Sequence, residues 1–223
     1  MSELKSNCRN CPAFPSSSFA GVDEEMITKI EGLGTRVKLK AGEEFRFERD
    51  GVAGCGCVHG GHLKIQHELR GQERTVRIAS PGDLIGFRNW FSSNAYSARA
   101  IEAGEVCFFK NEDFEELRQS HVISENIIKA LCETLRSSDQ HVASLEAFPL
   151  RSRVASTLLG LYHKMGRNPY LLIDRLTISE MAGTVPESLA RILTEFENEN
   201  MIERQARILY LKNLAALESA AAD

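Results

Sequence analysis

The stretch of the chain that most restricts its fold is residues 174–202, DRLTISEMAGTVPESLARILTEFENENMI. Asp174 is a good helix N-cap. Apolar side chains follow it at helical spacing, at Ile178, Met181 and Ala182. Gly183 fits a tight turn, because a positive φ has a low cost only for glycine. Pro186 then suits the first turn of a second helix, where its missing N–H would have no partner. The pattern predicts two short helices joined by a tight turn.

The second of these helices has two different faces. Its apolar face is predicted to be buried and consists of Leu189, Ile192, Leu193 and Phe196. Glu187, Ser188 and Arg191 point outward near the N-terminal end, where a DNA-reading helix carries its base contacts. The alternative is an ordinary corner between two helices without a nucleic-acid ligand.

A short hairpin is predicted directly after the second helix. Residues 201–213, MIERQARILYLKN, read as two strands around a Gln205–Ala206 turn. A hairpin in this place makes the segment a winged helix-turn-helix. Arg204 and Arg207 would then lie near the tip of the wing, where DNA phosphates could bind.

With this motif the sequence resembles the CRP/FNR family of bacterial transcription factors. Family members typically read R-E-T-V-x-R or V-E-T-x-S-R at the head of the recognition helix, and residues 186–191 of this chain read PESLAR. The resemblance implies base contacts by Glu187 and Arg191. Pro186 and Ala190 depart from the commonest patterns, which leaves the operator sequence open. The residues expected at the DNA are Thr184, Pro186, Glu187, Ser188, Arg191 and Arg204.

Composition agrees with a DNA-binding protein once charge is counted locally. The formal net charge of the chain is −4, but residues 150–213 carry nine Lys and Arg against seven Asp and Glu, which is +2. No apolar run approaches the roughly 20 residues that span a bilayer, and MSELKSN is no signal peptide, so we expect a cytoplasmic protein without a membrane partner. No phosphate loop, nucleophile elbow or useful His/Asp pairing suggests an enzyme.

The middle of the chain predicts a dimerisation helix. Apolar or small residues alternate steps of three and four, as in the a/d seam of a short coiled coil. They are Ile128, Leu131, Leu135, Ser138, Val142 and Leu145. The alternative is a single amphipathic helix that lies on its own domain. Family members pair through a long helix at this place, so the resemblance favours a homodimer on a near-palindromic operator of double-stranded DNA, and it also implies contact with RNA polymerase.

Residues 36–110 are rich in short strand patterns separated by Gly, Pro and Asp turns. This regular spacing predicts a jelly-roll-like barrel. It resembles the sensory β-roll of the family, most clearly at residues 81–87, PGDLIGF. The expected fold class is α+β. Its parts are a flexible cysteine-containing segment (1–20), a cyclic-nucleotide-binding-like β-roll (21–118), a dimerisation helix (119–147) and a winged helix-turn-helix domain (148–223).

The family resemblance argues against cyclic AMP as the ligand of the β-roll. Members that bind cyclic AMP carry a ribose-binding glutamate and an Arg-Ser pair for the phosphate. This chain has Phe87 at the glutamate position and Asn94 and Ala95 in place of the pair. Arg99 is offset by five residues, which puts it on the other strand face. A nucleotide phosphate would be buried without a cation, which is costly.

The cysteines suggest a different signal. A disulfide framework is not expected in a cytoplasmic chain. Cys8 and Cys11 form a C-x-x-C, a spacing that lets two thiolates bind one metal or cluster. Cys107 aligns with the β-roll cysteine of the [4Fe–4S] cluster in oxygen-sensing FNR-type proteins. The third N-terminal cysteine of those proteins is missing here, because residues 15–18 read PSSS.

Cys57 is the predicted replacement ligand. It shares a strand face with Cys55, and some family members with an N-terminal C-x-N-C also carry a cysteine at its position. The expected [4Fe–4S] ligands are therefore Cys8, Cys11, Cys57 and Cys107. Buried packing thiols, a thiol redox switch, zinc bound by fewer cysteines, and haem remain alternatives. Cys132 reads as a packing residue. His59 and His62 could be haem ligands, but histidines at an exposed strand end are usually solvent-facing.

These features together predict a dimeric transcription regulator that shifts between two dimer geometries. Oxygen or nitric oxide would act on the cluster and relax the helix pair. A haem- or ligand-responsive regulator without a cluster, and an interaction module with a degenerate helix-turn-helix, are the competing hypotheses.

Overall fold

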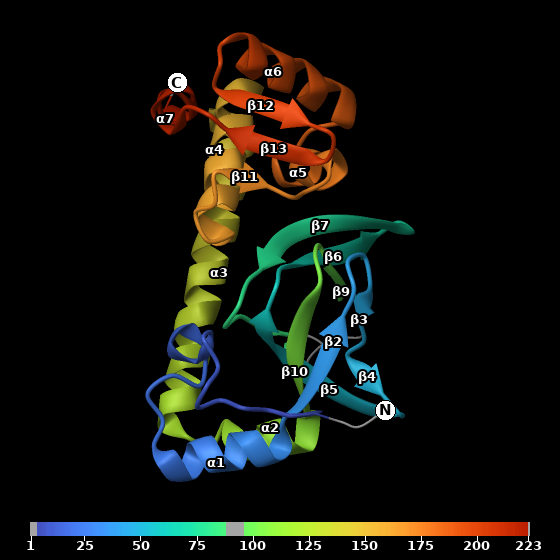
Figure 1. Ribbon diagram of the computed structural model, residues 1–223, viewed down its shortest axis with the longest axis vertical. Coiled ribbons are helices and arrows are strands. Elements are labelled where there is room, and N and C mark those ends of the chain that lie inside the picture. Colours follow the sequence, from blue (N-terminus) through green and yellow to red (C-terminus); the bar gives the residue numbers. More distant parts are fainter. Residues whose placement is uncertain (1–3, 88–95, 223) are drawn as a thin grey trace. The chain divides into compact units, whose positions relative to one another are not determined.

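The computed structural model describes residues 4–87 and 96–222. The chain divides into two compact units (Figure 1). The first contains the residues up to Gly71 together with Ala79–Leu135, and the second contains Gln72–Ile78 together with the residues from Arg136 onward. The predicted α+β architecture is confirmed, since a strand-rich N-terminal roll precedes helices and a C-terminal helix-turn-helix.

The roll consists of two sheets. The first has the order β1 (Leu4–Lys5), β2 (Thr35–Leu39), β10 (Gly104–Lys110), β5 (Val52–Gly60) and β4 (Glu48–Arg49), with β8 (Leu84–Ile85) pairing with β5. The second has the order β3 (Glu44–Phe45), β9 (Tyr96–Ala100), β6 (Leu63–Leu69) and β7 (Gln72–Ala79). β10 runs antiparallel to both β2 and β5. The predicted barrel-like arrangement of short strands is therefore present.

The two faces of β10 and β5 belong to two different cores. Val106 and Val58 are completely buried among apolar residues of both sheets, such as Leu39 of the first and Phe45 of the second. Because successive residues of a strand point to opposite faces, Cys107 lies on the outer face of the first sheet. That face is covered by η1 (Phe14–Ser16), α1 (Glu24–Leu33), α2 (Asn111–Leu117) and the start of α3 (His121–Ala147). The alternation thus directs the cysteines away from the interior of the roll.

The glycine of the family-like motif has a steric role. Gly86 follows β8 with a φ of +88°, a conformation that side chains rarely adopt. A Cβ at this position would lie 2.4 Å from the Phe47 ring. Any larger residue would therefore have to displace this ring.

The N-terminal segment is packed, in contrast to the expectation of a flexible tail. Ala13, Ser17, Ser18 and Phe19 are all buried. The Phe19 ring lies 5.3 Å from the Phe109 ring, centroid to centroid. The Asn126 side chain of α3 donates hydrogen bonds to the carbonyls of Ser18 (3.3 Å) and Ala20 (2.9 Å). Phe19 holds the segment on the roll by packing against Phe109. The Pro- and Ser-rich composition of the segment gave no indication of this contact.

The second unit contains the winged helix-turn-helix. Its elements are α4 (Leu150–Lys164), β11 (Tyr170–Leu171), α5 (Arg175–Met181), α6 (Pro186–Asn198), β12 (Ile202–Gln205), β13 (Ile208–Leu211) and α7 (Leu214–Ala222). The strands form a sheet in the order β11-β13-β12. Gln205 pairs with Ile208, so the turn is Ala206–Arg207, one residue later than predicted. Throughout the described residues, no helix combines the length and apolarity that a bilayer crossing requires.

Candidate functional site

The helix-turn-helix has the local structure that its sequence predicts. The Asp174 carboxylate accepts hydrogen bonds from the Thr177 N–H (2.7 Å) and the Thr177 hydroxyl (2.9 Å), which caps α5. Gly183 has a φ of +63°, and a Cβ there would lie 2.3 Å from Leu145 Cδ2. The backbone conformation therefore favours glycine at the turn into α6, and any Cβ there would also displace the end of the Leu145 side chain.

The recognition helix α6 presents the predicted residues. Its four apolar residues Leu189, Ile192, Leu193 and Phe196 are buried. Pro186, Glu187 and Arg191 are exposed, while Thr184 and Ser188 are half-buried. The polar face near the N-terminal end of α6 is thus free to contact base edges, as in other helix-turn-helix proteins.

Arg204 is committed to a contact within the domain. Its guanidinium forms an ion pair with Glu197 and donates to the Thr194 hydroxyl at 3.2 Å. The Arg204 N–H also donates to the Glu197 carboxylate at 2.9 Å. The side-chain hydrogen bond from Arg204 lowers the pKa of Glu197. Arg204 therefore ties the wing to the end of α6, and Arg207, exposed at the wing turn, is better placed for a phosphate.

Arg153 is a structural residue that the sequence did not reveal. From α4 its guanidinium donates to the carbonyls of Leu145 (3.3 Å) and Phe148 (3.1 Å) at the end of α3. It also donates to the carbonyls of Ala182 (3.2 Å) and Gly183 (3.4 Å) at the end of α5. One planar cation thus satisfies the unpaired carbonyls at the ends of two helices, and it joins the end of α3 to the turn before α6.

The predicted dimer seam is exposed along α3 in the single chain. The exposed fractions are 58% for Ile128, 37% for Leu131, 63% for Leu135, 63% for Val142 and 40% for Leu145. An apolar stripe of this kind normally lies against another surface. Cys132, predicted as a packing residue, is exposed next to this stripe.

The four predicted ligand cysteines line one pocket. The pocket is partly open to solvent. Cys8 and Cys11 come from the N-terminal segment, whereas Cys57 and Cys107 are directly opposed on β5 and β10. The other residues of the lining are Asn7, Ala13, Phe14, Ser17, Phe19, Val58, His59 and Phe109. Cys55 is completely buried and lies outside this lining.

The thiols of the pocket influence one another electrostatically. Burial, followed by the nearby Cys107, raises the pKa of Cys8 to about 12. Burial also raises the pKa of Cys57, with further contributions from Cys107, Cys11, Cys55 and Cys8. The pKa of Cys107 is likewise raised by burial. Several thiolates in so apolar a site would repel one another, so a bound cationic centre would stabilise their charged form.

This donor set suits an iron–sulfur cluster better than a single ion. Within residues 4–87 and 96–222, no three His, Cys, Asp or Glu side chains are placed to hold one metal ion. A four-iron cluster is held by four thiolates, each on a different iron, and therefore needs its sulfurs further apart. Four cysteines around one apolar pocket match this number of thiolates.

A histidine and a carboxylate extend the pocket. The Cys11 sulfur lies 3.0 Å from His59 Nδ1, and His59 Nε2 lies 3.9 Å from Glu105 Oε2. Burial and then Arg36 lower the pKa of His59. His62 lies 2.6 Å from a Glu102 oxygen. Both histidine side chains are mostly buried, at 16% and 14% exposure, so the expectation of solvent-facing rings was wrong.

The residues considered for cyclic-nucleotide binding have other contacts. Phe87 packs against the apolar cluster that contains Cys8, Cys57 and Cys107. Arg99 donates to the Gly42 carbonyl at 3.1 Å and lies 3.5 Å from a Glu44 oxygen. Asn94 and Ala95 lie outside the described residues.

Comparisons with known proteins agree with this architecture. A family model described as a Crp-like helix-turn-helix domain matches residues 152–220, and one described as a cyclic nucleotide-binding domain matches residues 36–121. The chain is 27% identical to the cyclic AMP receptor protein of Thermus thermophilus, over 92% of this chain and 97% of that protein. It is 22% identical to the transcriptional activator protein Anr of Pseudomonas protegens, over 93% of this chain and 89% of that protein.

A solved structure shows the same fold. FixK2 from Bradyrhizobium japonicum superposes with a TM-score of 0.71 at 20% identity, covering 85% of this chain and 98% of that one. The cyclic nucleotide-binding match precedes the helix-turn-helix match along the chain, and relatives such as Anr are named as transcriptional activators. The chain belongs to the CRP/FNR family of transcription regulators, with a DNA-binding helix-turn-helix at its C-terminal end.

Proposed function

We propose that this regulator binds DNA as a homodimer and that an iron–sulfur cluster held by Cys8, Cys11, Cys57 and Cys107 controls its binding. The observation that carries the proposal is the convergence of these cysteines, far apart in sequence, on one apolar pocket. The chemistry that such a cluster supplies when bound is sensitivity to oxygen or nitric oxide. Loss of the cluster from the pocket must then alter the affinity of the protein for DNA through a change in the packing of the chain.

The N-terminal segment connects the pocket to the dimerisation helix. Cys8, Phe19 and the α3 residue Ile123 are buried in one apolar cluster. Asn126 of α3 holds the carbonyls of Ser18 and Ala20 in the same segment. A displacement of Cys8 and Cys11 would therefore disturb the packing at the start of α3. Two packings of this region would give two dimer geometries whose populations depend on the pocket.

The dimer would present two recognition helices to the DNA. Pairing along α3 covers the exposed seam and places one α6 in each of two successive major grooves, about 34 Å apart. Glu187 would accept a hydrogen bond from cytosine N4, and Arg191 would donate to guanine O6 and N7. Thr184, Ser188 and Arg207 would contact phosphates, and binding would weaken steeply with salt. By analogy with the family, we also propose a contact with RNA polymerase.

The cluster is tested by iron and sulfide analysis of protein purified without air. We expect bound iron and acid-labile sulfide in the wild type, together with visible absorption, and loss of all three in Cys107→Ala. Cys55→Ala is the matched control, because Cys55 is a buried cysteine on β5 outside the pocket lining. Absence of iron and sulfide from the wild type would end the cluster proposal.

The base-reading role of α6 is tested by comparing two arginines. Arg191→Ala should lose selectivity for the operator, by about 1–3 kcal/mol per half-site, and keep salt-dependent binding to random DNA. Arg207→Ala, at the wing turn, should weaken binding to both DNAs about equally. Equal losses on operator and random DNA for Arg191→Ala would contradict base reading.

A thiol redox switch without a cluster is the second candidate. Cys57 and Cys107 are cross-strand neighbours, so hydrogen peroxide could oxidise the two thiols to a disulfide, and the peroxide would be reduced to two water molecules. This candidate predicts no bound iron and a DNA affinity that changes with the oxidation state of this pair. The iron analysis separates the two mechanisms.

A further inference from the structure

His59 lies next to the thiols of the pocket, and the cluster proposal gives it no role. It lies two positions after Cys57 on β5, and both side chains line the pocket. Its Nδ1 atom lies 3.0 Å from the Cys11 sulfur, which is within hydrogen-bond reach. His59 is therefore part of the pocket wall.

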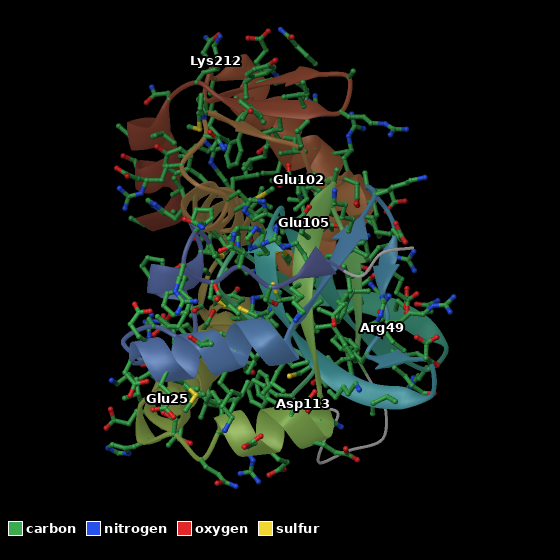
Figure 2. The ribbon with its side chains drawn as sticks, turned by 60° about the horizontal axis from the view of Figure 1, so that its bottom comes forward. Glu25, Arg49, Glu102, Glu105, Asp113 and Lys212 are labelled. Atoms are coloured by element: carbon green, nitrogen blue, oxygen red, sulfur yellow. The ribbon has the colours of Figure 1, made fainter. Side chains whose placement is uncertain are left out.

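The far side of the His59 ring faces a carboxylate. Glu105, on β10 and labelled in Figure 2, has an oxygen 3.9 Å from His59 Nε2. Arg36 lies 3.4 Å and Lys38 3.9 Å from the same carboxylate. The ring thus has a sulfur on one side and a carboxylate held by two cations on the other. At 3.9 Å this carboxylate is beyond hydrogen-bond distance, so the Cys11 sulfur is the nearer polar partner of the ring.

We infer that His59 is a positioning residue of the thiol site and donates a hydrogen bond from Nδ1 to the Cys11 sulfur when that sulfur binds the cluster. This inference rests on the proposed function. A metal-bound thiolate has no proton, so it can only accept in this contact. The direction of the hydrogen bond in the loaded protein follows from this.

The consequence is a specific role for Cys11 among the four ligands. Cys8, Cys57 and Cys107 are buried, whereas Cys11 is partly exposed. A hydrogen bond to its sulfur stabilises the additional negative charge of the reduced cluster, and so raises the reduction potential. His59 would thus help to keep the most accessible ligand in place and make the cluster harder to oxidise.

Three substitutions of His59 test whether an N–H donor is needed next to the Cys11 sulfur and whether it must lie at the position of Nδ1. His59→Leu removes the donor. His59→Asn retains an N–H at the position of Nδ1, because both nitrogens are bonded to Cγ. His59→Gln is the matched control, since its amide extends one bond further, toward the position of Nε2. Each protein is loaded anaerobically with iron and sulfide, and the readouts are the cluster midpoint potential and the rate at which visible absorbance is lost in air.

We expect a more negative midpoint potential and faster bleaching for His59→Leu and His59→Gln than for the wild type, and values near the wild type for His59→Asn. If His59→Leu fails to fold or load, the comparison of Asn with Gln decides. Equal potentials in all loaded proteins, or restoration by Gln and not by Asn, would overturn the role of His59 and leave the cluster intact. A wild type without iron and sulfide would overturn the proposed function, and this inference with it.

Discussion

Leu135 lies in the middle of the exposed seam of α3. Its truncation to alanine tests how much this seam contributes to the stability of the dimer. In the single chain 63% of its surface is exposed, so most of its contact area is available to a partner chain. Leu135→Ala removes this contact without disturbing a buried core. The substitution should therefore act on the association of two chains and leave the fold of each one unchanged.

The size of the effect follows from the exposed area. Removing three carbon atoms costs about 2.4 kcal/mol when they are fully buried. Scaled by the 63% exposed fraction, this is about 1.5 kcal/mol per chain. A two-fold dimer loses the contribution of both copies, about 3 kcal/mol, which raises the dimer dissociation constant on the order of 100-fold.

Sedimentation equilibrium over a wide concentration range measures this constant. Gln140→Ala is the matched control, because Gln140 is an exposed residue on the opposite face of α3 and should not change association. The thermal midpoint of each variant at low protein concentration confirms that the monomer is folded. A dissociation constant that Leu135→Ala changes no more than Gln140→Ala does would refute pairing through this seam.

Two further predictions concern the helix-turn-helix. Asp174→Ala removes the N-cap of α5 and should destabilise the DNA-binding domain by about 1 kcal/mol, measured by denaturant unfolding, whereas Asp174→Asn should retain most of the stability. The ion pair with Arg204 lowers the pKa of Glu197, so its stabilising effect is present at neutral pH and disappears as the pH falls below about 4. The difference in thermal midpoint between the wild type and Glu197→Gln should consequently shrink between pH 7 and pH 3, and a constant difference would contradict this assignment.

The helix-turn-helix could be predicted from sequence because each of its local signals has a local cause. Asp174 caps α5 through its own side chain, and Gly183 adopts the positive φ that the turn requires. Pro186 is the first residue of α6. The helical spacing of Leu189, Ile192, Leu193 and Phe196 identified the buried face of α6. The exposed face is the opposite one. Signals of this kind depend on a few neighbouring residues, which the sequence displays directly.

The convergence of the cysteines could be predicted in part. The sequence and the family resemblance selected Cys8, Cys11, Cys57 and Cys107, and the structure places all four at one pocket. Cys55 and Cys57 lie two residues apart on the same strand, so their spacing alone could not show which of them lines the pocket and which is a core residue. The difference arises from the register of β5 and β10, which pairs Cys57 with Cys107. The sequence does not contain this register in any local pattern.

Long-range side-chain contacts were beyond sequence reasoning. Arg204 looked like a phosphate ligand because it lies near the wing, but Glu197 of α6 engages its charge. His59 looked solvent-facing, because neither Cys11, 48 residues earlier, nor Glu105 is near it in sequence. The packing of the N-terminal segment through Phe19 was hidden for the same reason. Each of these results depends on which elements pack together.

The most direct test of the account is the affinity of one anaerobically prepared sample for a near-palindromic operator, measured before and after exposure to air. The account predicts tight, dimeric binding while the iron and sulfide are present, and much weaker binding once they are lost, with no such difference in Cys107→Ala. Equal affinity in the two states of the wild type would contradict control of DNA binding by the pocket of Cys8, Cys11, Cys57 and Cys107.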